Sequence, residues 1–68
     1  MDARKLLEFL EKNKDNANVK RFIDGMEESF TYVIEYGSFL KYLRENPLDD
    51  VPVYEDDLAD ILAGKWEA

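Results

Sequence analysis

The chain has 68 residues, which is enough for one folded domain and no more. Hydrophobic residues make up 46% of it and charged residues 37%, a balance typical of a globular domain rather than a disordered tail. The sequence contains no cysteine and no histidine. Disulfides, cysteine-based metal sites, the commonest zinc ligand and the usual general base are therefore excluded. From the length of the chain, we expect residues 1–68 to form a single domain.

The formal net charge of −7 comes entirely from the last third of the chain. Residues 1–44 carry eight basic and eight acidic side chains, whereas residues 45–68 carry eight acids and only Lys65. This distribution argues against direct binding to nucleic acid, whose phosphates need a basic surface, and against binding to anionic membranes. It would attract a protein with a basic surface. The simpler alternative is that the acids only keep the domain in solution.

The sequence has no apolar run near the roughly 20 residues that a membrane-spanning helix requires. The first residues, Met1 to Lys5, lead directly into an amphipathic pattern, with no long apolar stretch or cleavage site of a signal peptide. We therefore expect a cytoplasmic protein that does not contact membranes.

A first helix is predicted over residues 3–13, with Asp2 placed to cap it. Its buried face, at the i, i+3, i+4 and i+7 spacing of a helix, consists of Ala3, Leu6, Leu7 and Leu10. Residues 13–16 are polar turn formers, so the chain should reverse direction there.

A longer apolar pattern predicts helical structure up to residue 45, capped by Asn16 or Asn18. Its core face consists of Val19, Phe22, Ile23, Met26, Phe30, Val33, Ile34 and Leu40. Gly25 is the expected break in this region, whereas the helix should continue or bend at Gly37. Pro47 ends the region, because the residue before a proline leaves the helical conformation.

The last third should contain a connector and a short final helix. The apolar residues expected to hold the connector against the core are Leu48, Val51 and Val53. The helix should begin near Tyr54, where an acidic first turn complements the helix dipole, and end at Gly64. Trp66 should then fold back onto the domain. The stripe that this helix buries is formed by Leu58, Ile61 and Leu62.

No segment combines strict alternation of apolar and polar residues with turn signals, so a sheet is not expected. The sequence therefore predicts an all-α fold, a small bundle of three or four helices with a long central helix that is either straight or kinked. A domain of this size hides only about 60% of the surface of its unfolded chain, so its stability should be modest.

A second row of large side chains runs along the predicted central helix. This aromatic row, spaced i, i+4, i+7 and i+11, consists of Tyr32, Tyr36, Phe39 and Leu43. A neighbouring helix of the same domain could cover it, as is common for a central helix. Alternatively it could form an interface, where tyrosine and tryptophan are over-represented. Phe39 is expected in the core, and Tyr32 and Tyr36 are the better interface candidates.

Six acids lie within twelve residues of the connector and final helix: Asp49, Asp50, Glu55, Asp56, Asp57 and Asp60. Three interpretations are open: a solvated surface that complements the helix dipole, a docking patch for a basic protein, or a divalent metal site. A docking patch would present carboxylates much as nucleic-acid-mimicking inhibitors do. The metal signal is weak, because a calcium-binding loop needs a central glycine that is absent here.

Catalysis is not expected. Ser29, Thr31 and Ser38 have no histidine to activate them, and the sequence has no glycine-rich phosphate loop. The neighbours of Ser29 are Glu28 and Phe30, which depart from the Asp-Ser-Leu of phosphopantetheine carrier domains. We therefore predict a protein that is not an enzyme and holds no cofactor or metal.

The leading hypothesis is a small acidic protein–protein interaction module, an inhibitor or regulator of the type found in phages and mobile elements. It would dock its acidic last third on a basic-surfaced protein such as a nucleic-acid enzyme, with the acids steering and the aromatic residues anchoring. The alternative is a self-associating structural or accessory subunit with the aromatic row as a homodimer seam. The candidate partner-binding residues are Tyr32, Tyr36, Tyr42, Asp49, Asp50, Tyr54, Glu55, Asp56, Asp57, Asp60 and Trp66.

Overall fold

The computed structural model of the chain describes residues 1–29 and 32–66, apart from the side chains of Tyr32 and Val33. The described residues form five helices: α1 (Ala3–Lys12), α2 (Ala17–Ser29), α3 (Tyr32–Tyr36), α4 (Phe39–Glu45) and α5 (Glu55–Ala63). No strand occurs among them beyond one isolated bridge between Asp2 and Asp50. The predicted all-α class is confirmed.

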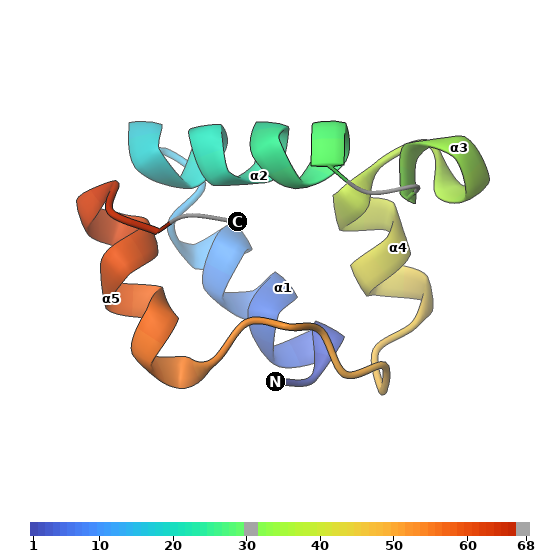
Figure 1. Cartoon of the computed structure of the whole chain (residues 1–68). Helices are drawn as coiled ribbons and strands as arrows, with labels where there is room; N and C mark the ends of the chain where they lie inside the picture. The colour runs from blue at the N-terminus through green and yellow to red at the C-terminus, as the bar shows by residue number, and fades with distance from the viewer. Residues whose placement is uncertain (30–31, 67–68) are drawn as a thin grey trace.

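The helix α2 lies across one end of α5, α1 and α4, with α1 between the other two, and α3 lies beyond the end of α2 (Figure 1). α1 packs chiefly on α4, while α2 packs on both α5 and α4. The connector between α4 and α5, orange in Figure 1, runs past the first turn of α1. Segments far apart in the sequence therefore meet in a body of 29 × 21 × 20 Å.

The predicted long central helix is wrong, because α2, α3 and α4 are separate helices. Gly25, the expected break, lies inside α2, where its cost of about 1 kcal/mol relative to alanine is outweighed by the burial of the apolar side chains around it. Within the described residues, the helical conformation is interrupted at Gly37, whose φ of +85° is left-handed and cannot continue a right-handed helix. Ser38 then begins α4, since its hydroxyl accepts a 3.0 Å hydrogen bond from the Lys41 N–H.

The start of α1 is held by backbone rather than by its expected cap. Asp2 occupies the cap position, but its side chain makes no capping hydrogen bond. Instead, the N–H groups of Ala3 and Arg4 donate to the carbonyls of Asp49 and Pro47, at 2.8 and 3.1 Å. The connector thus satisfies donors that a helix leaves unpaired at its first turn, and this ties it to α1.

The predicted cap at Asn16, the predicted start of the last helix near Tyr54 and its predicted end at Gly64 are confirmed. Asn16 begins α2, because its Oδ1 accepts hydrogen bonds from the N–H groups of Asn18 at 2.7 Å and Val19 at 3.3 Å. Gly64 ends α5 in the left-handed conformation with a φ of +75°. Tyr54 precedes α5, and its N–H donates a 2.9 Å hydrogen bond to the Asp57 carboxylate.

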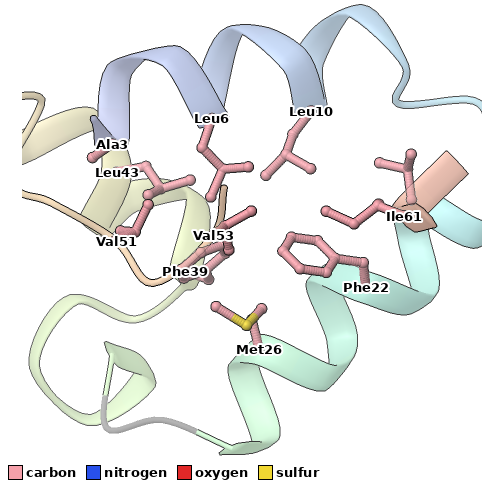
Figure 2. Close-up of a cluster of buried hydrophobic side chains, with 11 residues drawn as sticks. Ala3, Leu6, Leu10, Phe22, Met26, Phe39, Leu43, Val51, Val53 and Ile61 are labelled. Carbon is pink, nitrogen blue, oxygen red and sulfur yellow. The ribbon is translucent and has the colours of Figure 1, made fainter. Parts of the chain in front are cut away.

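The core gathers side chains from α1, α2, α4, α5 and the connector (Figure 2). Figure 2 shows the ring of Phe22 near its centre. The centroids of the Phe22 and Phe39 rings lie 6.3 Å apart in an edge-to-face arrangement. The fully buried members are Ala3, Leu6, Leu10, Val19, Phe22, Met26, Phe39, Leu43, Val51, Val53 and Ile61. The core places predicted for Phe39, Val51 and Val53 are therefore confirmed.

Two residues predicted to contact the core are instead exposed. Ile34 is 84% exposed, because a helical wheel holds only along one continuous helix and α3 is a short helix of its own. Leu48 is 87% exposed, since it lies in a turn closed by a 3.1 Å hydrogen bond from the Asp49 N–H to the Asn46 carbonyl. The core places predicted for Phe30 and Val33 lie outside the residues, or side chains, that the structure describes.

Candidate functional site

The candidate partner-binding residues fall into three groups on the fold. The first joins α3, α4 and the connector, and contains Tyr36, Tyr42 and Asp49. The second surrounds the start of α5 and contains Asp50, Tyr54, Glu55, Asp56 and Asp57. The third contains Asp60, farther along α5, and Trp66, which follows the helix. The prediction for the side chain of Tyr32 lies outside the described residues.

The first group is a small network of intramolecular contacts. The rings of Tyr36 and Tyr42 meet edge to face, with centroids 5.3 Å apart. The Tyr42 hydroxyl donates a 2.9 Å hydrogen bond to Asp49 Oδ2, and its ring stacks on Phe39 at 6.4 Å. Both tyrosines are half-buried. Much of their surface therefore packs within the domain, and less of it is available to a partner.

The aromatic row does not form one continuous face. Phe39 and Leu43 are completely buried in the core of the same chain, so a neighbouring part of the domain covers them. Among the residues of the aromatic row whose side chains the structure describes, only Tyr36 is partly exposed to solvent. The break at Gly37 separates it from α4, which explains why spacing along one helix misplaced it.

Two acids of the second group pair with cations of the N-terminal region. Asp50 lies 3.3 Å from the amino group of Met1, which also donates to the carbonyls of Val51 and Val53. Glu55 accepts a 2.8 Å hydrogen bond from Lys5 Nζ. This hydrogen bond, together with the charge of Lys5, lowers the pKa of Glu55 below its ordinary value of 4.5. The same contact raises the pKa of Lys5 above 10.5.

The remaining acids of α5 divide into one structural and two unpaired carboxylates. Asp57 accepts from the N–H of Tyr54 at 2.9 Å and so stabilises the first turn of α5. Asp56 and Asp60 are exposed and form no ion pair with any described residue. Tyr54, directly before α5, is a large side chain that is 70% exposed. The available charge therefore lies on the outer face of α5.

Trp66 folds back onto the domain as predicted. Its ring meets Phe22 edge to face, with centroids 4.8 Å apart, and it is half-buried. Together with Ile61 these rings form the apolar floor of a 170 Å³ pocket between α2 and α5, whose rim includes Asn18 and Arg21. Trp66 thus packs the C-terminal segment of the chain against α2.

A larger groove lies between α1, α2 and α4, and sequence reasoning missed it. It measures about 390 Å³, with an apolar floor formed by Leu10, Ile23 and Leu40. Its charged rim is formed by Glu11, Lys14 and Arg44. The only signal in the sequence was the position of Ile23 and Leu40 in the predicted core face, which indicated burial and not a groove.

The described residues contain neither a cluster of metal-ligating side chains nor a helix that could span a membrane. Among them, no three acidic side chains gather closely enough to hold a metal ion. None of the described helices has the length and apolar character that crossing a membrane requires.

No protein-family model, curated protein or solved structure matches the chain. No relative therefore supplies an activity or a set of functional residues. A functional proposal has to stand on the exposed side chains, their charges and their contacts.

Proposed function

We propose that this chain is a small acidic protein–protein interaction module that binds a protein with a basic surface, such as a nucleic-acid enzyme, as its inhibitor or regulator. The observation that carries the proposal is the outer face of α5, where Asp56 and Asp60 are exposed and unpaired within the described chain. Residues four apart on a helix project from one face, so the two carboxylates act on the same region of a partner.

The intramolecular contacts of the other acids narrow the proposed surface. Asp49 and Asp57 accept hydrogen bonds from within the chain, and Asp50 and Glu55 lie against cations. Pairing with a cation reduces the field that a carboxylate exerts on an approaching protein. The proposed contact therefore centres on α5, with the exposed ring of Tyr54 at its N-terminal end as an apolar anchor.

The test is capture of a partner by three tagged forms of the chain. Wild type, D56N/D60N and the matched control D15N/D24N are incubated with a lysate of the source cells, and captured proteins are identified by mass spectrometry. The two variants change the net charge equally, but Asp15 and Asp24 are exposed residues of the first two thirds of the chain. We expect a basic protein to bind wild type and D15N/D24N and to be lost from D56N/D60N.

Salt provides the second arm of this experiment. The screening length falls from about 10 Å at 0.1 M salt to about 3 Å at 1 M, so the captured protein should dissociate as salt is raised. Equal loss from both variants would show that only net charge matters. Retention of the same partner by D56N/D60N would contradict the proposed α5 surface.

A self-associating accessory subunit is the second candidate function. The observation in its favour is Ile34, which is 84% exposed on α3. An exposed large aliphatic side chain is suited to an apolar contact between copies. Under this alternative, I34D should reduce the sedimentation mass of a concentrated solution, and added salt should not.

A further inference from the structure

Leu48 is the most exposed of the large apolar side chains in the described chain, at 87%. It projects from the turn after α4, and carboxylates stand on both sides of it in the sequence, at Glu45, Asp49 and Asp50. Asp49 also accepts the Tyr42 hydrogen bond, and Asp50 lies near the Met1 amino group. We call Leu48 with Asp49 and Asp50 the acidic knob.

The groove between α1, α2 and α4 has the opposite character. Its floor is apolar, since Leu10 is fully buried and the flanking Ile23 and Leu40 are only half-buried. Lys14 and Arg44 on its rim are exposed and form no ion pair with any described residue. Together with Glu11, they give the rim a net charge of +1. Its volume of about 390 Å³ is more than enough for one leucine side chain.

We propose that the acidic knob of one copy of this chain binds the groove of a second copy. Leu48 would cover the half-buried Ile23 and Leu40, removing apolar surface of both copies from water. Asp49 and Asp50 remain exposed beside their intramolecular partners, and the Asp50 side chain is 90% exposed. Their carboxylates can therefore lie in direct contact with Lys14 and Arg44, and this charge complementarity selects the orientation. An exposed apolar side chain that fits a pocket elsewhere on the same molecule is a recognised route to self-association.

This contact is separate from the surfaces proposed above. It uses neither Asp56 nor Asp60 on α5, so D56N/D60N should leave it unchanged. It also differs from the α3 contact of the second candidate function, because Ile34 takes no part in it. The three proposals can therefore fail independently.

The test measures the sedimentation mass of the full chain up to about 1 mM, a concentration that detects even weak specific binding. Wild type is compared with L48D and with the matched control A59D, which places the same charge on an exposed residue of α5. We expect wild type and A59D to associate to the same extent and L48D to remain a monomer. Far-UV circular dichroism checks that all three retain their helices.

A complementation experiment then tests knob against groove. L48D lacks the knob but keeps the groove, and K14E/R44E has a reversed rim but keeps the knob. Each alone should be a monomer, and their equimolar mixture should form a 1:1 complex, since it contains one intact knob and one intact groove. A monomeric wild type, equal loss of association in A59D, or no complex in the mixture would each overturn the proposal.

Discussion

Lys5 Nζ lies 2.8 Å from Glu55 Oε1 and donates a hydrogen bond to it, so the first helix of the chain is tied to the start of the last. The two residues are fifty positions apart. Glu55 belongs to the acidic stretch, and the contact shows that part of this stretch is neutralised by the balanced half of the chain. Charge counted along the sequence therefore overstates the charge that a partner meets.

The pH dependence of this ion pair gives the first prediction. Glu55 has a lowered pKa, so the pair stabilises the fold above about pH 4.5 and is lost as the pH falls through the lowered pKa. Lys5 has a raised pKa, so on the alkaline side the stabilisation persists to pH 10.5 and is lost above it. In an NMR titration, K5M should raise the Glu55 midpoint back toward 4.5.

The matched control for this titration is R4M. Arg4 pairs with Glu8 at 3.5 Å on the surface of α1, and removing it takes away the same charge without touching Glu55. The Glu55 midpoint should therefore stay at its wild-type value in R4M. An unchanged midpoint in K5M as well would contradict the ion pair.

Two glycines should respond in opposite directions to the same substitution. Gly64 has a φ of +75°, and a Cβ there would lie 2.8 Å from Asn18 Oδ1, whose amide donates to the Leu62 carbonyl. We expect G64A to lower the free energy of unfolding by about 1 kcal/mol or more. Gly25 is inside α2, and a Cβ there meets nothing within 4 Å, so G25A should raise it by about 0.5–1 kcal/mol.

Urea denaturation of the two variants measures both effects under one condition. The pair is a direct check on the helix boundaries, because a break at Gly25 would make G25A destabilising. Equal destabilisation by both substitutions would contradict the continuous α2.

Burial predicts a large difference between two apolar residues close in the sequence. Phe39 is completely buried at the centre of the core, so F39A should cost about 3–5 kcal/mol. The whole domain is expected to have only about 3–10 kcal/mol of stability, so this variant could unfold outright. Ile34 is 84% exposed, and I34A should change the free energy of unfolding by less than about 0.5 kcal/mol.

Thermal unfolding followed by circular dichroism separates these outcomes. If F39A is unfolded at room temperature, the milder F39L gives a measurable transition below that of wild type. A loss of stability in I34A comparable to that in F39L would place Ile34 in the core and contradict the structure.

Trp66 is the only tryptophan in the chain and so reports on its own packing. Its contact with Phe22, at 4.8 Å, predicts that F22L shifts its fluorescence to longer wavelength, because water gains access to the ring. W66A should lower the free energy of unfolding by at least about 0.5–1.5 kcal/mol, the contribution of an aromatic pair beyond area burial. L48A serves as the control, and its emission should equal that of wild type. A wild-type spectrum in F22L would contradict the contact.

Local signals in the sequence were sufficient for much of the secondary structure. Asn16, Gly64 and the apolar spacing of α1 each act within a few residues, so the predicted start of α2, end of α5 and first helix are confirmed. The prediction that the helix continues or bends at Gly37 was wrong, because local signals do not decide the conformation of this residue. A glycine permits both a helical and a left-handed conformation, and its neighbours do not show which one the fold selects.

The candidate site was less predictable than the helices. Spacing along one helix placed Tyr36 in line with Phe39, but the chain breaks between them and only Phe39 is fully buried. Asp50 pairs with the Met1 amino group and Glu55 pairs with Lys5. Both ion pairs depend on where the N-terminal segment and α1 lie, and no sequence pattern near the two acids predicts that position. The proposed binding surfaces were therefore narrowed by contacts between distant segments.

The sequence by itself determined the all-α class, the single acidic third and most helix ends, because composition, apolar periodicity and capping residues act locally. Only the tertiary structure decided which side chains are available to a partner. It paired Glu55 with Lys5, left Asp56 and Asp60 unpaired, turned Leu48 outward and opened the groove beside Ile23. The physical reason is that exposure and charge neutralisation depend on which surfaces of distant helices meet, and this is set by packing of the whole chain.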